Sequence, residues 1–118
     1  MDDLTDHILE LLDHPDIAPK RMFGGVGFFR EGVMFALIAY EELYFRVDEL
    51  SEPDFESLGL GRFVYEKPGG KAMSMSYCKA PPDAYDAPGI MQEWAEKGFA
   101  AACRVDAAKP KSKQKRSR

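Results

Sequence analysis

Histidine, cysteine and tryptophan are scarce in this chain of 118 residues, which has two, two and one of them. His7 and His14 would lie about 10.5 Å apart along a helix axis, too far to share one metal ion. Cys78 and Cys103 are too few for a disulfide framework and lack metal-ligand spacing, so we expect both as core or half-buried thiols. We therefore predict no metal, no cofactor and no catalytic residue, and a protein that is not an enzyme.

The sequence also lacks a long apolar run. No stretch approaches the ~20 residues that span a bilayer. The N-terminus, Met1-Asp2-Asp3, is acidic where a secretory signal is basic. From these absences we expect a cytoplasmic protein without membrane contact.

Acidic residues are missing from the C-terminal end, and this absence divides the chain. The formal net charge is −4, but residues 1–108 have ten basic and 20 acidic side chains. We expect residues 1–108 to form one domain and residues 109–118 to form a disordered basic tail. The tail would hold nucleic acid weakly through phosphates, without base specificity; the alternative is a solvated end. Its candidate contacts are Lys109, Lys111, Lys113, Lys115, Arg116 and Arg118.

Helical periodicity appears at both ends of the domain. Apolar residues recur at helical spacing over residues 3–13 and again over residues 88–105. Asp86 is the expected N-cap of the later helix, and Trp94 lies in the middle of its apolar arc, where Trp94→Ala would cost about 3–5 kcal/mol. Ser51 is expected to cap a short helix between the strands.

The middle of the chain predicts about five strands. Met22–Phe29, Val33–Tyr40 and Leu43–Val47 are joined by short turns at 30–32 and 41–42, so they can only form an antiparallel meander. Val33–Tyr40 is apolar on both faces and should be central. Residues 63–66 and 72–78 form a second hairpin. The fold class is therefore α+β, with two layers: an antiparallel sheet of about five strands flanked by N- and C-terminal helices.

One block of the sequence combines closely spaced glycines with aromatic residues and methionines in a distinctive order. The block runs Arg21-Met22-Phe23-Gly24-Gly25-Val26-Gly27-Phe28-Phe29, then Gly32, Met34-Phe35-Ala36 and Leu43-Tyr44-Phe45-Arg46-Val47-Asp48. It resembles the N-terminal domain of the TfoX/Sxy family of bacterial competence regulators. Tyr77 and Trp94-Ala95 also fit the family, and the resemblance covers about residues 3–105. It implies a fold similar to type III secretion chaperones. It also implies a link to transcription, because founding members induce DNA-uptake genes together with a cyclic-AMP receptor protein. We expect a stand-alone copy of this domain, since the full-length regulators continue into a second one.

The glycine cluster at 24–27 is not a phosphate loop, because no lysine and Ser/Thr pair follows and the next segment is a strand. Glycine there lets the strand bulge or another chain approach closely, and it would leave a strip of uncovered backbone. Methionines on the late hairpin share one face and add an adaptable surface. The candidate partner surface is Met22, Gly24, Gly25, Gly27, Phe29, Met73 and Met75.

Two functions remain open from the sequence. The first is a regulatory adaptor that binds a protein partner, such as a transcription factor, with the tail touching nearby DNA. The second is a general protein-interaction module, chaperone-like in behaviour and without a link to DNA. Either could act as a monomer or a homodimer.

Overall fold

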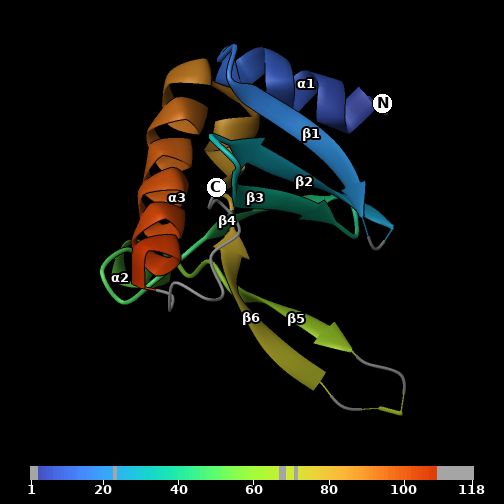
Figure 1. Ribbon diagram of the computed structural model, residues 1–118, viewed down its shortest axis with the longest axis vertical. Helices are drawn as coiled ribbons and strands as arrows, with labels where there is room; N and C mark the ends of the chain where they lie inside the picture. The colour runs from blue at the N-terminus through green and yellow to red at the C-terminus, as the bar shows by residue number, and fades with distance from the viewer. Residues whose placement is uncertain (1–2, 23, 67–68, 71, 109–118) are drawn as a thin grey trace.

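A computed structural model of the chain describes residues 3–22, 24–66, 69, 70 and 72–108, and only the backbone of residues 65, 66 and 72–74. Its six strands form one antiparallel sheet in the order β1-β2-β3-β4-β6-β5 (Figure 1). The strands are β1 (Ile17–Met22), β2 (Gly25–Arg30), β3 (Val33–Ala39), β4 (Glu42–Arg46), β5 (Arg62–Glu66) and β6 (Ala72–Lys79). The α+β class, the meander and the second hairpin are confirmed.

The sheet has one strand more than the sequence predicted. Ile17–Met22 forms β1 at the edge of the sheet and pairs with β2 along its whole length. Met22 therefore ends this strand instead of starting the next, and Gly24 makes the turn with a φ of 75°. A proline and two cations in six residues are typical of a loop. At an edge, however, pairing on one side suffices, and Pro19 is tolerated there.

The turn between β3 and β4 lies one residue earlier than predicted. Ala39 pairs with Glu42, so the two-residue turn is Tyr40–Glu41 and not Glu41–Glu42. Both turn residues have positive φ, at 53° and 63°. This geometry follows the right-handed twist of the strands, although side chains other than glycine adopt it at a cost.

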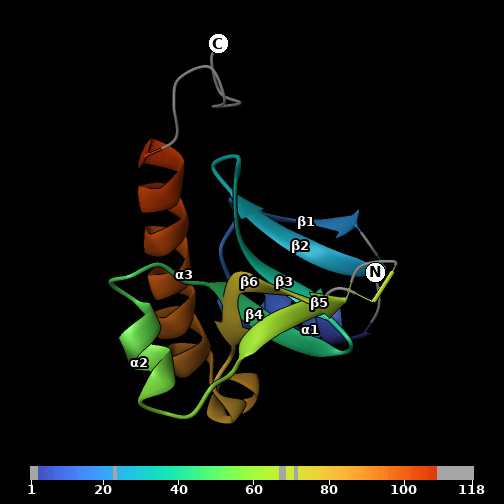
Figure 2. The same ribbon diagram turned by 90° about the horizontal axis from the view of Figure 1, so that it is seen from below.

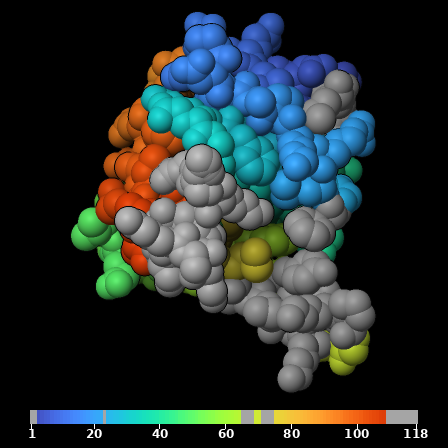
Figure 3. Space-filling model, in the orientation of Figure 1, coloured from blue at the N-terminus to red at the C-terminus, as the bar shows by residue number. Residues whose placement is uncertain are grey.

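Two helices pack on one face of the sheet. α1 (Asp3–Leu12) and α3 (Pro88–Ala108) enclose the main core with β2, β3 and β4, and α3 lies alongside the sheet (Figure 2). Gly98 permits the close crossing, because a Cβ there would lie 3.0 Å from the Phe35 carbonyl oxygen. In Figure 3 the cyan β2–β3 hairpin borders the orange atoms of α3. There Arg30 pairs with Glu96 at 2.8 Å and stacks on the Phe99 ring at 4.1 Å.

The position of Trp94 differs from the sequence prediction. The buried line of α3 runs through Met91, Ala95, Gly98 and Ala102, while Trp94 is half-buried beside it. Trp94 still contacts the core, because its ring packs edge-on against Phe55 with 4.8 Å between centroids. The Trp94 ring therefore covers Phe55 at the edge of the core and does not lie at the centre of the buried face of α3.

A β-bulge in β3 changes which side chains face the helices. Phe28 pairs with Ala36 and Phe29 with Met34, which leaves Phe35 as the extra residue. As a result Phe35 and Ala36 both join the core under the helices, and Leu37 packs on the opposite side of the sheet. Strict alternation along this strand would have assigned these faces wrongly.

The caps of two helices also differ from the prediction. α2 (Glu52–Glu56) is not capped by the Ser51 side chain. Instead, Ser51 Oγ accepts from the Asp48 amide and Asp48 Oδ1 accepts from the Ser51 amide, both at 3.1 Å, so Asp48 organises this turn. Asp86 belongs to the short helix η1 (Pro82–Asp86) and does not cap α3, whose first turn bonds to the Ala87 carbonyl.

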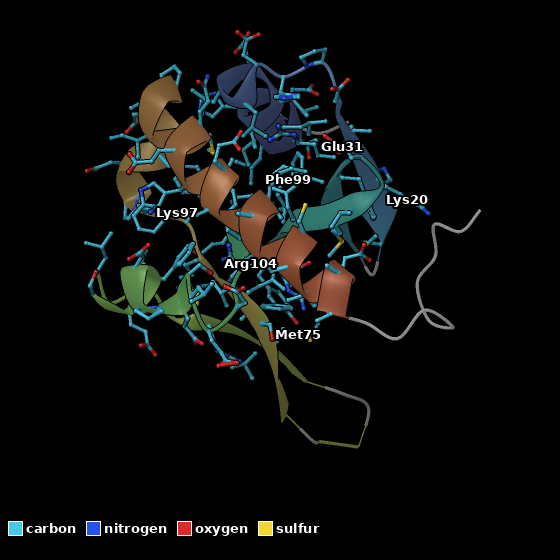
Figure 4. The ribbon with its side chains drawn as sticks, turned by 60° about the vertical axis from the view of Figure 1, so that its left-hand side comes forward. Lys20, Glu31, Met75, Lys97, Phe99 and Arg104 are labelled. Atoms are coloured by element: carbon cyan, nitrogen blue, oxygen red, sulfur yellow. The ribbon has the colours of Figure 1, made fainter. Side chains whose placement is uncertain are left out.

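Asp48 ties this turn to α3. Arg104 donates to its two carboxylate oxygens at 2.6 and 2.9 Å (Figure 4). These bonds are the main cause that lowers the pKa of Asp48 from 3.8 to about 2, and the Ser51 amide adds to them. Because the folded pKa is the lower one, the stabilisation is present above about pH 4 and is lost as the pH falls toward 2.

We expect Asp48→Asn to lower the free energy of unfolding by about 1–2 kcal/mol at pH 7, with the difference from the wild type shrinking below pH 4. Urea unfolding at pH 7 and pH 3 measures it. Asp54→Asn is the matched control, since Asp54 meets Lys97 at 3.1 Å on a more exposed site. A difference that stays constant with pH, or an equal loss in the control, would contradict the assignment.

Candidate interaction surface

The face of the sheet opposite the helices carries a second apolar cluster. Among the residues that the structure describes, this cluster is built by strands alone. We call it the helix-free face and define it by the side chains that point there: Lys20, Met22, Phe29, Met34, Leu37, Glu42, Tyr44, Arg46, Phe63, Met75, Tyr77 and Lys79. An apolar sheet face without a covering helix is the feature of this fold that calls for a function.

Aromatic rings form the centre of this face. Tyr44 and Phe63 pack with 4.9 Å between ring centroids, and Tyr40, at the tip of the β3–β4 turn, lies 6.1 Å from Phe63. The Arg46 guanidinium lies over the Tyr77 ring at 5.5 Å. Burial raises the pKa of both Tyr44 and Tyr77, so their hydroxyls stay protonated at neutral pH. Tyr44, Phe63 and Tyr77 are buried in this cluster, while Tyr40 is 74% exposed at its edge.

Methionine and phenylalanine side chains lie around this centre and remain partly exposed. A Cβ built at Gly27 would lie 2.8 Å from Met34 Sδ and 3.1 Å from Met22 Cε. Phe29 pairs with Met34 across the strands, and Met75 packs on the β6 side of the cluster (Figure 4). Flexible thioethers can repack against apolar side chains of different shapes.

The glycines at 25 and 27 allow close packing inside the domain, whereas the sequence suggested an uncovered strip of backbone. Met22 and Met34 cover Gly27, so the backbone there is not open to a partner. A Cβ at Gly25 would overlap the Ile38 carbonyl oxygen at 2.1 Å, so this glycine admits β3 of the same chain. Gly24 is exposed in the β1–β2 turn. Close packing inside the domain accounts for these glycines, and the methionines make the surface.

The structure brings most of the sequence-predicted surface together. Met22, Gly25, Gly27, Phe29 and Met75 point to the helix-free face. The Met73 side chain and the tail residues lie outside the described part of the chain: Lys109, Lys111, Lys113, Lys115, Arg116 and Arg118.

Sequence reasoning missed the charged side chains of this face and five of its apolar or aromatic ones. Alternation along β4 and β6 could have found Tyr44 and Tyr77. Tyr44 is next to the core residue Phe45 in the chain and Tyr77 is next to the core residue Cys78, so both point to the opposite face. The bulge hid Met34 and Leu37. No local signal predicts that Phe63 meets Tyr44.

Among the residues that the structure describes, two further candidate sites, a pocket and the histidines, are small or already satisfied. A shallow pocket of about 130 Å³ lies between α1, β1 and α3, well under the roughly 300 Å³ of an ordinary ligand site. His7 Nε2 lies 2.7 Å from the Tyr85 carbonyl oxygen, and His14 Nδ1 accepts from the Asp16 amide at 3.1 Å. Over the described ranges, no group of three or more His, Cys, Asp or Glu side chains is placed to hold a metal ion.

The cysteines occupy the environments expected of them. Cys78 is buried and Cys103 is half-buried. Burial is the main cause that raises the pKa of Cys78 to about 11, so this thiol is protonated at neutral pH and a poor nucleophile. Within the described residues, the helices are too short or too polar to cross a bilayer.

Comparison with protein families matches this chain to the TfoX N-terminal domain over residues 10–102. The matched part contains all six strands and reaches from the end of α1 into the last turns of α3. It therefore includes every described residue of the helix-free face. Comparison with curated proteins finds no match.

Proposed function

Since the chain belongs to the TfoX N-terminal domain family, we propose that it is a regulatory adaptor of the cytoplasm that binds a protein partner in transcription control. The family is generally regulatory and not catalytic. The adaptor acts by binding, and its binding site is the helix-free face of the sheet.

The observation that carries this proposal is the apolar character of both sheet faces. An antiparallel sheet with one layer of helices ordinarily turns polar residues to its free side. Here Met22, Phe29, Met34 and Met75 are partly exposed on that side, around a buried aromatic centre. Contiguous apolar surface of this kind marks interaction sites in proteins. A partner would cover these side chains.

The tail adds a second element to the proposal. Residues 109–118 contribute six cations and no acid, and they follow α3 directly. Such a segment contacts phosphates without base specificity, so it would strengthen binding near DNA without choosing the sequence. In this proposal the partner protein recognises the specific DNA sequence.

Photocrosslinking in the native cell tests the adaptor function. We expect benzoylphenylalanine at Phe29 to capture another protein, and the same group at Glu93, exposed on α3, to capture little. Mass spectrometry identifies the captured protein. Capture at Phe29 of a transcription regulator supports the proposal. Capture of a second copy alone favours a homodimeric interaction module, and no capture at Phe29 contradicts both.

A further inference from the structure

We infer that the helix-free face binds an acidic segment of its partner in which Asp or Glu side chains accompany apolar ones. This inference rests on the proposed adaptor function and specifies the chemistry of the partner. It follows from how charge is distributed between the two faces of the sheet.

The helix-free face is basic on a strongly acidic domain. Residues 1–108 have twice as many acidic as basic side chains. Among the described strand side chains of this face, however, three are basic and one is acidic. The basic ones are Lys20, Arg46 and Lys79, and the acidic one is Glu42. The other acids whose side chains are described lie on the helices, in the turns and in the loops. Such an asymmetry orients the domain and attracts a partner of negative charge.

Two cations of this face have no carboxylate partner within the described chain. Lys79 pairs with Glu42 at 3.1 Å, and four cations that contact the helical layer also form ion pairs: Arg30, Arg62, Lys97 and Arg104. Neither Lys20 nor Arg46 pairs with any described acid, although acids outnumber bases. Arg46 Nε is buried without an acceptor. A carboxylate brought by the partner would neutralise this guanidinium.

The exposed side chains favour a protein segment over nucleic acid. Single-stranded nucleic acid stacks its bases on accessible aromatic rings. On this face Tyr44, Phe63 and Tyr77 are at least nine-tenths buried. Tyr40, in the β3–β4 turn, is 74% exposed and Phe29 is partly exposed, but the other partly exposed apolar groups are mainly thioethers. Thioethers suit aliphatic and aromatic protein side chains.

The α1 helix of a second copy does not supply the required segment. α1 is acidic and amphipathic, but its apolar side chains Ile8, Leu11 and Leu12 are buried in its own core. The acidic stretch around α2 also has exposed apolar side chains, Leu50 and Leu58. Its acids already form ion pairs within the same chain: Asp48 with Arg104, Glu52 with Arg62 and Asp54 with Lys97. The segment is therefore assigned to a different protein, or to a part of one that is unfolded before it binds.

Peptide display against the full-length protein tests this chemistry. From a random library of twelve-residue peptides, we expect enrichment of sequences that combine acidic and apolar residues. An enriched peptide, labelled with a fluorophore, then reports affinity by anisotropy. Enrichment of basic or neutral peptides, or no enrichment, would overturn the inference.

Two neighbouring residues of β1 give a matched pair of variants. Lys20 pairs with Gly27 and Arg21 with core Val26, so the two exposed cations stand on opposite faces of one strand. We expect Lys20→Glu to weaken peptide binding about five-fold or more and Arg21→Glu to change it less than about two-fold. The basic tail and the net charge are the same in both variants. Equal effects would assign the binding to long-range charge or to the tail, and would overturn the inference.

Further measurements distinguish an acidic segment from other molecules that could bind this face. They also distinguish failure of this inference from failure of the proposed adaptor function. Lys20-dependent binding of a twelve-nucleotide single strand, tighter than that of the peptide, would replace the acidic segment by nucleic acid. A dimer in sedimentation that Lys20→Glu dissociates would replace it by a second copy. If crosslinking at Phe29 captures a regulator through a neutral or basic segment, the adaptor function stands and the acidic segment is wrong. If acidic peptides bind in vitro but crosslinking at Phe29 captures no protein in the cell, the preference for acidic segments stands and the adaptor function is wrong.

Discussion

Gly25→Ala is expected to lower the free energy of unfolding by about 3 kcal/mol or more, from the addition of one methyl group. The new Cβ would lie 2.1 Å from the Ile38 carbonyl oxygen. That oxygen belongs to β3, which β2 and β4 hold from both sides, so it cannot move away alone. The end of the β2–β3 ladder would have to open, next to the buried side chain of Val26.

Two other glycines separate this overlap from the effects of glycine itself. A Cβ at Gly61 or Gly24 meets nothing within 4 Å, but Gly24 has a φ of 75° and Gly61 does not have a positive φ. We expect Gly61→Ala to change the stability by less than about 0.5 kcal/mol and Gly24→Ala to cost about 1 kcal/mol. Chemical denaturation of the three variants measures the series. If Gly25→Ala costs no more than Gly24→Ala, the close approach of β3 is wrong.

Trp94→Ala is expected to cost about 2–3 kcal/mol, somewhat less than a fully buried tryptophan would. The ring is half-buried, yet it covers Phe55, which is completely buried. Without the indole, water would reach the Phe55 ring and the contact between α2 and α3 would loosen. Unfolding followed by circular dichroism is the suitable measurement, because Trp94 is the only tryptophan and its fluorescence is lost.

Leu58→Ala is the matched control for this variant. Leu58 follows α2 and is 56% exposed, so its loss should cost less than about 0.5 kcal/mol. Trp94→Phe keeps a ring over Phe55 and should recover more than half of the loss. A cost below about 1 kcal/mol for Trp94→Ala would mean that the ring does not cover Phe55.

The sequence by itself determined the elements that depend on local patterns. Helical spacing of apolar residues fixed α1 and α3, and two- or three-residue connections required an antiparallel meander. The block from Met22 to Asp48 also identified the family. Each of these signals is a pattern along one continuous segment of the chain, so no knowledge of distant contacts was needed.

The tertiary structure decided the features that depend on pairing across the chain. Residues 17–22 become β1 because β2 offers them a hydrogen-bonding edge, which their own composition does not indicate. The bulge at Phe35 follows from fitting two consecutive side chains under α3, and it assigns Met34 and Leu37 to the other face.

The charge of the candidate surface was decided in the same way. From the sequence, the domain is uniformly acidic and its glycines look open to a partner. In the fold, nonlocal ion pairs join four cations to acids of the helices and of the turn before α2, while Lys20 and Arg46 are left beside the methionines. Net charge is a sum over the chain, but a partner meets one face, and only the sheet register determines which side chains share it.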